Sequence, residues 1–384
     1  MKALALAALI VIAGLDTDLD RRVTEIASRG RLPGFAVAVL TKDGILFQKG
    51  YGWADLEKKV PYTPQSLQNI GSISKTFISV SLMQLVEQNR IRLDDDVNRY
   101  LSFKLVNPHF PGDVITIRHI ARHRATLIDT DDFWRNDYIL SPLQPVRRGL
   151  AQVDVLRAKN TRIPMDQFIR NILAPDGKWY RKDNFLKTRP GTTFQYSNLG
   201  AAVAAHVVER VTGESFAEYT DRHIFEPIGM SHTGWSFDTI DLDQYVTQYI
   251  GKMKVVPRYS IITYPDGGLI TSVEDLSRYL MEMMKGYQGE SELLRKESFR
   301  ELMSPAWWMP GTSDYNLFWT LRADGTIGHN GGDPGTNTSM FFHPGRNLGA
   351  IVFTNYSLGG NDDPARRQFL DVANALMADG GAPN

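Results

Sequence analysis

A serine and a lysine lie three residues apart in the segment GSISKTF, residues 71–77. Residues at this spacing share one face of a helix, with their Cβ atoms about 5–6 Å apart. A lysine amine acts as a base when burial or a neighbouring cation lowers its pKa. Ser72 and Lys75 are therefore candidates for a nucleophile and the base that activates it. The alternative is a solvated helix surface, where most pairs of this kind lie.

The residues that follow this pair favour the catalytic interpretation. Residues 78–93 read ISVSLMQLVEQNRIRL, a largely apolar pattern that predicts a buried helix. Ser72 would then lie near a helix start, where backbone N–H groups lack partners and the helix dipole favours a developing negative charge.

A tyrosine and an asparagine lie two residues apart at Tyr196 and Asn198, between a turn (PGTT) and an expected helix. Side chains two apart in an extended segment point the same way. Tyrosine can transfer protons when cations lower its pKa, and asparagine offers both a donor and an acceptor. A loop tyrosine beside a turn asparagine is the alternative interpretation.

Glycines follow a histidine in the segment GHNGGDPG, residues 328–335. Glycine lets a substrate approach the backbone closely, which makes Gly331 and Gly332 candidates for substrate binding. His329 could donate a hydrogen bond or transfer a proton. The alternative is a glycine-rich hairpin with an incidental histidine.

Other catalytic and cofactor motifs are absent from the sequence. No serine lies in Gly-x-Ser-x-Gly, and there is no His-Glu-x-x-His, Walker loop or dinucleotide-binding glycine motif after a strand. His119 and His123 lie four residues apart on a possible helix, but no nearby carboxylate completes a metal-binding face. We therefore expect neither a metal nor a cofactor.

The composition excludes several classes of protein. The 384 residues suffice for a large core. The 43 basic and 43 acidic residues give a formal net charge of zero, which argues against a nucleic-acid binder. Because there is no cysteine, disulfides, thiolate nucleophiles and zinc–cysteine sites are excluded.

The N-terminal segment predicts export. Lys2 precedes an apolar run over residues 3–13, and acidic residues follow from Asp16. This pattern is typical of a cleaved secretory signal, here residues 1–14, and indicates a periplasmic or secreted protein. The alternative is a buried first helix. The run is too short to cross a bilayer and no other segment is long and apolar enough, so no membrane span is expected.

The two ends of the chain predict strands and the middle predicts helices. Strands are expected at residues 35–40 and 45–52, around a hairpin turn, and again at 318–322, 326–329, 339–343 and 349–353. A last helix is expected at residues 364–377. The expected fold class is α/β (α+β), a mainly antiparallel sheet built from N- and C-terminal segments, flanked by helices, with a helical subdomain inserted between them.

We expect residues 15–384 to form a single domain. Its sheet lobe would comprise about residues 20–70 and 286–384, and its helical lobe about residues 71–285. Residues 129–187 are rich in Asp, Arg and Trp and weakly periodic, which predicts a long excursion over the surface or the cleft mouth. A substrate cleft is expected where the sheet meets the helices.

The three motifs, taken in order, resemble those of a known superfamily. Ser72-x-x-Lys75, Tyr196-x-Asn198 and HNG at residues 329–331 resemble the motifs of the serine β-lactamases and penicillin-binding proteins, in the class C-like branch. That branch includes class C β-lactamases, D-alanyl-D-alanine carboxypeptidases, D-aminopeptidases and family VIII esterases. Flanking segments are also similar, so the resemblance spans residues 32–355 and implies a β-lactamase/transpeptidase-like fold.

The resemblance also implies roles for these residues. Ser72 would form an acyl-enzyme, and Lys75 and Tyr196 would share the proton transfers, with either as the acylation base. Asn198 would hydrogen-bond the substrate and Lys75. The N–H groups of Ser72 and Gly332 would form an oxyanion hole, and Tyr196 would activate the water that releases the product.

Two departures from the family pattern bear on the substrate. HNG replaces the common Lys-Thr-Gly, so that His329, largely neutral at pH 7, lies where a lysine helps to bind the carboxylate of penicillins. HRATL at residues 123–127 replaces the usual His-Thr-Ser-Gly-Leu. Arg122, Arg124 and Arg135 are candidates for a replacement cation.

We therefore expect a serine hydrolase that cleaves an ester or amide in a small-molecule or peptide substrate, as a β-lactamase-related esterase or D-amino-acid-specific peptidase. One alternative is a true β-lactamase or a D-alanyl-D-alanine carboxypeptidase, acting on β-lactams or peptidoglycan-derived substrates. Others are an acyltransferase that uses the same acyl-enzyme and a non-catalytic cell-wall or ligand-sensing relative. The sequence leaves the oligomeric state open.

Overall fold

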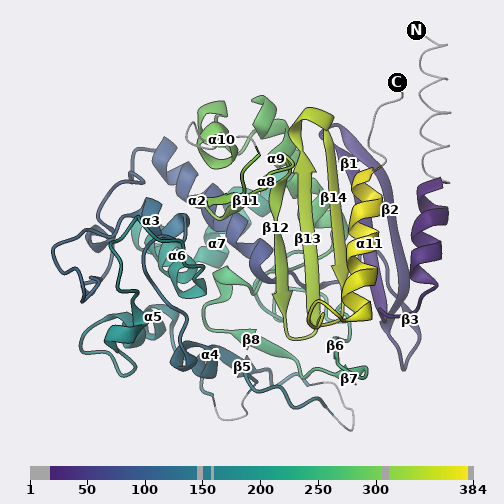
Figure 1. Ribbon diagram of the computed structural model, residues 1–384, viewed down its shortest axis with the longest axis horizontal. Coiled ribbons are helices and arrows are strands. Elements are labelled where there is room, and N and C mark those ends of the chain that lie inside the picture. Colours follow the sequence, from purple (N-terminus) through teal and green to yellow (C-terminus); the bar gives the residue numbers. More distant parts are fainter. Residues whose placement is uncertain (1–17, 145–149, 157–159, 305–310, 379–384) are drawn as a thin grey trace.

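Strands from both ends of the chain form one antiparallel sheet in the computed structural model of this protein (Figure 1). The structure describes residues 18–144, 150–156, 160–304 and 311–378. Among these residues, the sheet has eight strands, in the order β10-β11-β12-β13-β14-β1-β2-β3. In that order the strands are Asp314–Asn316, Trp319–Leu321, Ile327–Asp333, Thr336–His343, Leu348–Thr354, Gly34–Thr41, Gly44–Asp55 and Val60–Pro61. The two ends of the chain meet where β1 pairs with β14.

The sequence of β1 suits the centre of this sheet. Its first seven residues, GFAVAVL, are all buried, as expected for a strand that is covered on both faces. Because side chains alternate along a strand, Ala36 and Ala38 belong to the apolar cluster on the helical side, whereas Phe35 and Val37 belong to the cluster on the outer side. The small alanines allow α9 (Val273–Gln288) to pack against this strand.

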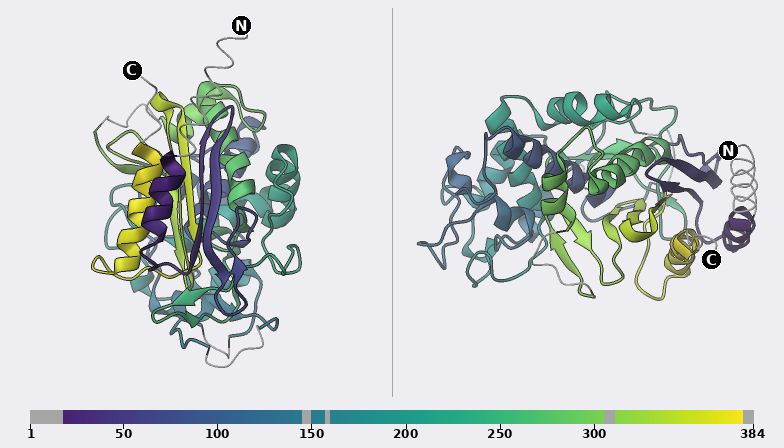
Figure 2. Two further views of the ribbon diagram at one scale, coloured as in Figure 1. Left: turned by 90° about the vertical axis from the view of Figure 1, so that its right-hand side faces the viewer. Right: turned by 90° about the horizontal axis from the view of Figure 1, so that it is seen from above.

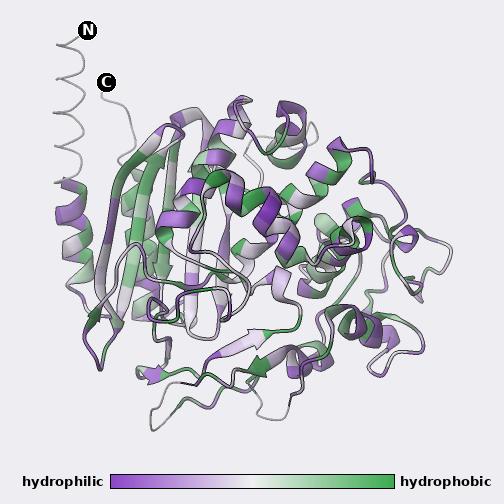
Figure 3. Ribbon diagram, turned by 180° about the vertical axis from the view of Figure 1, so that it is seen from behind, coloured by the Kyte–Doolittle hydropathy of each residue, from purple (hydrophilic) through white to green (hydrophobic). Residues whose placement is uncertain are grey.

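The outer face of the sheet is covered by helices from both ends of the chain. Residues 18–27 are helical and lie beside α11 (Pro364–Ala378), as Figure 2 shows. Leu19 and Val372, one from each helix, belong to the same buried cluster. Figure 3 shows apolar strands in the sheet and polar residues on the outward faces of the helices.

The helical part of the molecule lies against the inner face of the sheet (Figure 1). Its longer helices are α2 (Lys75–Glu87), α5 (Met165–Leu173), α6 (Asn198–Thr212), α9 and α10 (Lys296–Met303). Its shorter helices are α3 (Ile117–Ala121), α4 (Asp131–Asp137), α7 (Phe216–Thr220) and α8 (Glu226–Ile228). Two-stranded pairs connect them: β4 (Gln68–Asn69) with β9 (Ile270–Thr271), β5 (Tyr138–Leu140) with β8 (Tyr259–Ile261), and β6 (Tyr249–Ile250) with β7 (Lys254–Val255).

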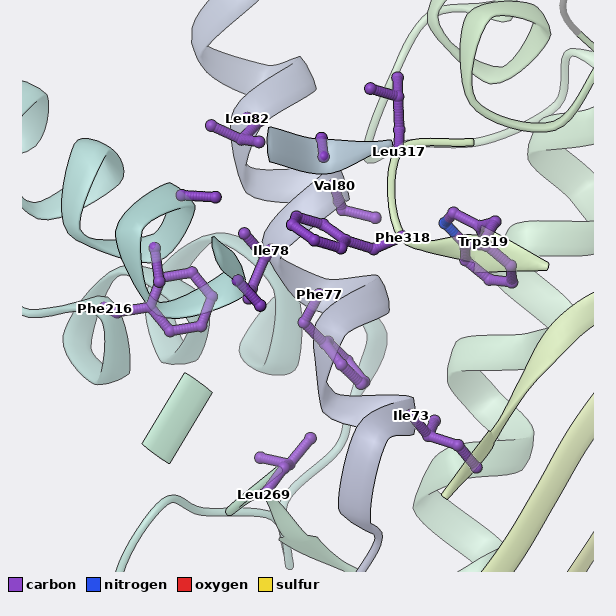
Figure 4. Close-up of a cluster of buried hydrophobic side chains, with 14 of the residues drawn as sticks. Ile73, Phe77, Ile78, Val80, Leu82, Phe216, Leu269, Leu317, Phe318 and Trp319 are labelled. Carbon is purple, nitrogen blue, oxygen red and sulfur yellow. The ribbon is translucent and has the colours of Figure 1, made fainter. Parts of the chain in front are cut away.

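Helix α2 lies at the centre of this helical part. Figure 4 shows apolar side chains gathered around it, from its own residues and from neighbouring segments. All its residues from Lys75 to Met83 are buried. The hydroxyls of Thr76, Ser79 and Ser81 donate to backbone carbonyls about one turn earlier, so these polar groups are paired within the core.

The predicted fold class is confirmed, with differences at the ends of elements. The helix predicted over residues 78–93 begins at Lys75 and ends at Glu87. It ends there because Asn89 adopts a left-handed backbone with φ +57°, a conformation that commonly follows a helix. The strands predicted near the two ends correspond to β1, β2 and β11–β14, and the last predicted helix to α11. The sheet's edge strands β3 and β10, which are two and three residues long, were not predicted.

The region predicted as an excursion contains ordered elements. Helix α4 and strand β5 follow Asp129, and α5 packs against α6. Phe133 of α4 lies edge-on to Phe168 of α5, with ring centroids 5.8 Å apart, and both side chains are buried. This region therefore contributes to the core.

The predicted signal at residues 1–14 lies outside the described residues. In the part of the chain that the structure describes, no helix combines the length and the apolarity that a bilayer crossing needs.

Phe77 lies where α2 contacts its neighbours, with its ring centroid 4.0 Å from that of Tyr279 and 5.6 Å from that of Phe225. Replacing Phe77 with Ala should lower the free energy of unfolding by about 3–5 kcal/mol, because the change leaves a cavity. Urea denaturation measures this loss. Leu370→Ala, at a half-exposed position of α11, is the control and should have little effect. Similar losses in both variants would contradict this account of the core.

Candidate active site

Ser72 lies on one 3₁₀ turn, η1 (Gly71–Ser74), that leads directly into α2. Such a turn has about three residues per turn, so side chains three apart lie directly above one another. Accordingly, Lys75 Nζ donates to Ser72 Oγ over 3.0 Å. From the sequence, Ser72 and Lys75 were expected near the start of an α-helix. The structure instead places Ser72 on the tighter 3₁₀ turn, which brings its side chain into contact with that of Lys75.

The Lys75 side chain is fully buried and fully hydrogen-bonded. Besides Ser72, its Nζ donates to Asn198 Oδ1 over 2.7 Å and to the backbone carbonyl of Asp266. These are three acceptors for the three protons of an ammonium group. Lys75 thereby joins η1 to the start of α6 and to the 3₁₀ turn η5 (Tyr264–Asp266).

Lys75 and Tyr196 influence each other's protonation. Nζ lies 5.2 Å from the centroid of the Tyr196 ring. Burial lowers the pKa of Lys75, but the electrostatic interactions with Tyr196 and Asp266 outweigh this effect and leave the pKa raised. Burial also raises the pKa of Tyr196, against the effect of the Lys75 charge and of hydrogen bonding with Ser72. The free protein therefore keeps the pair as ammonium and phenol, whereas a lysine base needs a lowered pKa.

A carboxylate that the sequence analysis did not identify holds the Tyr196–Asn198 loop. Asp129 accepts from the backbone N–H groups of Asn198 over 2.6 Å and Leu199 over 3.0 Å, and from the Ser197 hydroxyl over 2.8 Å. The N–H groups of a first helical turn lack partners within the helix, and a negative group there is favourable. Asp129 thus fixes the start of α6, and no local sequence pattern connects it with a loop 69 residues away.

His123 supports the same loop through its imidazole. Its Nδ1 accepts from the Ser197 backbone N–H over 3.2 Å, and its ring centroid lies 4.3 Å from that of Tyr196. Burial lowers the pKa of His123 well below its usual range, so that it is a neutral acceptor. From the sequence, His123 was considered as part of an incomplete metal-binding pair with His119 and as the first residue of the HRATL segment, but not as a support for this loop.

Turn η1 and strand β12 approach each other so closely that both need glycine. A Cβ atom on Gly331 would lie 1.9 Å from the carbonyl oxygen of Ile70. A Cβ atom on Gly71 would lie 2.6 Å from the backbone nitrogen of Gly332, and Gly71 also has a left-handed φ of +54°. This contact brings Ser72 and Gly332 to the same cleft.

His329 lies beside the site as a neutral imidazole. It is 3% exposed, and its Nδ1–H donates to the Asn330 carbonyl oxygen. Burial, followed by the Lys75 charge, lowers the pKa of His329 to about 3. At neutral pH this side chain therefore cannot act as a cationic partner for a substrate carboxylate.

Some of the predicted site residues line a cleft of about 370 Å³, a volume at the lower end of small-molecule sites. Those that line it are Ser72, Tyr196, Asn198 and Gly332. Lys75 and His329 are buried outside this lining, and Gly331 packs against Ile70. Two larger cavities, of about 700 and 890 Å³, do not include Ser72.

The rest of the cleft lining is mainly acidic and aromatic. It includes Asp129, Asp137, Asp266, Asp333, Phe133, Trp134 and Tyr138, and among the described residues it includes no Arg or Lys. Arg124 instead pairs with Asp314 at 3.3 Å, and Arg135 pairs with Asp131 at 3.2 Å. None of the three arginines considered as a replacement cation lines the cleft.

The loop that departs from the family pattern contains a strained residue. Thr126 lies where relatives commonly have glycine, and its φ is +65°. A left-handed backbone costs a β-branched residue about 1–3 kcal/mol. The Thr126 hydroxyl accepts from Asn107 Nδ2 over 2.9 Å, an interaction that glycine could not make.

Three of the lining aspartates act on one another. Burial raises the pKa of Asp137 to about 7, and the charge of Asp333 adds to the effect. Burial likewise raises the pKa of Asp333 to about 7, with a contribution from Asp266. Burial raises the pKa of Asp266 well above its usual range, against the Lys75 charge and with a contribution from Asp137. Neighbouring like charges resist simultaneous ionisation.

Comparison with protein families assigns this chain to one family. The family model described as Beta-lactamase matches residues 19–375. Protein flp of Staphylococcus aureus (strain N315) is 22% identical over 346 residues, which cover 88% of this chain and 62% of that protein. The chain therefore spans less than two-thirds of that relative. PbpX of Bacillus subtilis (strain 168) is 25% identical over 329 residues, 84% of this chain and 71% of that protein.

Solved structures share the fold at low identity. The octameric penicillin-binding protein homologue from Pyrococcus abyssi has a TM-score of 0.68 and 22% identity, covering 94% of this chain and 77% of that one. A class C beta-lactamase has a TM-score of 0.69 and 17% identity, covering 97% and 98%. EstCE1, a hydrolase with promiscuous acyltransferase activity, has a TM-score of 0.68 and 19% identity, covering 94% and 99%.

The Gly331–Ile70 contact predicts that an added methyl group on Gly331 displaces Ser72. Gly331→Ala should push η1 away from β12 and slow the labelling of Ser72 by a fluorophosphonate by about 10²-fold, the scale of a 1 Å misplacement. Mass spectrometry follows the labelling, and circular dichroism checks the fold. Gly44→Ala is the matched control, since no atom lies within 4 Å of its added Cβ. Equal labelling of the two variants would disprove this role of Gly331.

The raised pKa of Asp333, about 7, predicts a pH-dependent stability. An unfolded aspartate titrates at about pH 3.9, so between about pH 4 and 7 the folded protein holds a proton that the unfolded chain has lost. Stability therefore falls as pH rises through this window. Asp333→Asn removes the titration and can still accept from Tyr138 through Oδ1.

Calorimetry from about pH 4 to 8 tests this dependence. The gain in unfolding temperature of Asp333→Asn over the wild type should be smallest near pH 4 and largest above pH 7. Asp43→Asn, at an exposed turn, should show no such trend. If the gain in unfolding temperature shrank as pH rose, ionisation of Asp333 would not destabilise the folded protein.

Proposed function

The chain belongs to the Beta-lactamase family, and on this basis we propose that it is a serine hydrolase that cleaves an ester or amide through a Ser72 acyl-enzyme. The contact between Ser72 Oγ and Lys75 Nζ, 3.0 Å apart at the edge of a cleft, carries the proposal. Residues 15–384 would act as one catalytic domain in this reaction.

Acylation would begin when Ser72 Oγ attacks the substrate carbonyl and its proton passes to the Lys75–Tyr196 pair. Both pKa values are raised, so the pair must first lose one proton. An ammonium stabilises a neighbouring phenolate, and the charge of Tyr196 helps to raise the pKa of Lys75. We therefore favour Tyr196 as the proton acceptor and Lys75 as the cation that stabilises it.

The oxyanion would be stabilised by the N–H groups of Ser72 and Gly332. Loss of one such donor typically costs about 10²–10³ in rate. Asn198 Oδ1 holds Lys75, which leaves the amide NH₂ of Asn198 to donate to the substrate. Tyr196 would then return its proton to the leaving group. In deacylation, Tyr196 would take a proton from the attacking water, and Ser72 would recover its hydroxyl as the acid departs.

The surroundings of the site favour an ester or a D-amino-acid amide over a penicillin. A carboxylate-bearing β-lactam benefits from a cation in the cleft, whereas His329 is neutral and the described cleft lining contains several aspartates but no Arg or Lys. The volume of about 370 Å³ favours a small acyl group. We therefore rank esterase or D-amino-acid-specific peptidase activity above β-lactamase and carboxypeptidase activity.

The same acyl-enzyme could pass its acyl group to an alcohol or amine. The fold neighbour EstCE1 is a hydrolase with promiscuous acyltransferase activity, which makes this the second candidate. A non-catalytic cell-wall or ligand-sensing role would not need the Lys75 contacts with Ser72 and Asn198. The signal at residues 1–14 would place any of these activities in the periplasm or outside the cell.

Substitution of the nucleophile tests the proposal directly. The wild type should hydrolyse p-nitrophenyl butyrate, and Ser72→Ala should reduce kcat by at least about 10⁴-fold, as expected for loss of a catalytic nucleophile. Tyr196→Phe should lower kcat with a small change in KM, because it removes a proton acceptor and leaves the ring. Fluorophosphonate adducts mapped by mass spectrometry should lie on Ser72.

Two controls accompany this experiment. Ser313→Ala, at an exposed serine, should keep the wild-type rate. Adding alcohols or amines and analysing the products separates acyl transfer from hydrolysis. Full activity of Ser72→Ala would exclude the acyl-enzyme, and turnover of benzylpenicillin faster than that of the ester would reverse the ranking of substrates.

A further inference from the structure

Three carboxyl groups from distant parts of the chain meet in the cleft beside Ser72. Asp137 ends α4, Asp266 ends the turn η5, and Asp333 ends β12. All three line the same cavity as Ser72. We refer to Asp137, Asp266 and Asp333 as the carboxyl cluster. Its assembly from three separate elements sets it apart from a run of acidic residues on a solvated surface.

Within the described residues, the buried Oδ2 atom of Asp266 has no hydrogen-bond partner. Asp266 is only 5% exposed, and among the described residues no donor reaches its Oδ2. By contrast, Asp137 Oδ1 accepts from the backbone N–H and the hydroxyl of Thr263, and Asp333 Oδ1 accepts from the Tyr138 hydroxyl over 2.7 Å. A buried carboxyl oxygen without a donor is costly, and a ligand that donates to it or carries positive charge would remove that cost.

The cleft has more acidic than basic groups. Lys75 is the one cation near the cluster in the described structure that affects the pKa values of Asp266 and Asp333. Its three protons are already donated to Ser72, Asn198 and the Asp266 carbonyl. The acidic side chains therefore exceed the positive charge available within the described residues.

A metal ion does not fit this arrangement. In the described part of the chain, no group of three His, Cys, Asp or Glu side chains is placed to hold one. A metal ion needs ligands that converge on one point, whereas a larger organic cation can contact several carboxyl groups that do not converge. Trp134 and Tyr138 also line the cleft, and aromatic faces attract ammonium groups.

We propose that the carboxyl cluster binds a positively charged group of the substrate, and that the enzyme selects esters or amides that carry an ammonium or quaternary ammonium group. This inference rests on the proposed function of Ser72, since it names the substrate of that site. It also accounts for a cleft whose described lining includes no Arg or Lys side chain.

The proposal predicts how selectivity changes with pH. Groups that face the cluster from neighbouring elements are the Lys75 ammonium, the Asp129 carboxyl, and the Tyr138 and Tyr259 hydroxyls. The pKa values of Asp137 and Asp333, both about 7, mean that these carboxyls are neutral in acid and ionise as pH rises. The preference for a cationic substrate should therefore grow from about pH 5 to 8.

Matched pairs of esters test the preference. In the first pair the acyl group is 4-(trimethylammonio)butanoyl or its neutral isostere 5,5-dimethylhexanoyl, both as p-nitrophenyl esters. In the second pair the charge lies in the alcohol, as in acetylcholine against 3,3-dimethylbutyl acetate. The charge of a quaternary ammonium does not titrate, so the pH dependence of each kcat/KM ratio reports on the protein. Rates of alkaline hydrolysis without enzyme correct for intrinsic reactivity.

We expect at least a tenfold preference for the cation in one pair at pH 8, falling as pH decreases. Asp266→Asn and Asp333→Asn should each reduce this preference at least threefold, measured within each variant as the ratio of kcat/KM for the cationic ester to kcat/KM for the neutral ester. Asp43→Asn, at an exposed turn, should keep the wild-type ratio. Ratios near one in both pairs, with good turnover of the neutral esters, would overturn the inference and leave the proposed function intact.

Binding to an inactive variant separates the two proposals. Calorimetry with Ser72→Ala measures the affinities of choline and of its neutral isostere 3,3-dimethylbutan-1-ol. Choline that binds more tightly than its isostere, with the difference lost in the Ser72→Ala, Asp266→Asn double variant, would support the carboxyl cluster. This result would hold even if the wild type hydrolysed none of the esters. Such a lack of hydrolysis would refute the proposed hydrolase activity alone. Equal binding of the two compounds would count against the cluster whatever the turnover.

Discussion

One buried ammonium group holds together the elements on which the candidate site depends. Lys75 Nζ donates to Ser72, to Asn198 and to the carbonyl of Asp266, which belong to η1, α6 and η5. A charge in a core is tolerable only when all its protons have acceptors, so each of these elements must be in place before the lysine can be buried. The apolar contacts around α2 support the helix, while Lys75 sets the positions of the side chains at its N-terminal end.

The electrostatic balance of the cleft has a cost for stability. Asp137 and Asp266 are buried and Asp333 is half-buried in the same cleft, and removal from water raises the pKa of each. A protein selected for stability alone would replace at least one of them by a neutral side chain, because unpaired buried carboxyls oppose folding at neutral pH. Their presence beside Ser72 is the pattern expected when a binding site is kept at the expense of stability.

The sequence was informative where the decisive contacts are local. Ser72 and Lys75 are three residues apart, so their contact follows from one turn, and the alternation in β1 follows from the period of a strand. The carboxyl cluster was not predicted, because its members come from three distant segments and no spacing connects them. Asp129 was missed for the same reason, since its partners lie 69 and 70 residues away. The end of α2 was misplaced because a left-handed residue at Asn89 outweighed a continuing apolar pattern.

The pairing of β1 with β14 has a consequence for how the protein is made. Phe35 pairs with Thr354, so β1 cannot complete its pairing until β14, which lies far later in the sequence, has been synthesised. Contacts of such long range form late in folding, since closing the intervening loop is entropically costly. Strand β12, which contacts η1 through Gly331 and Gly332, also comes from this late segment. A nascent chain therefore contains Ser72 long before it contains β12, and the contact between η1 and β12 forms only after β12 has been synthesised.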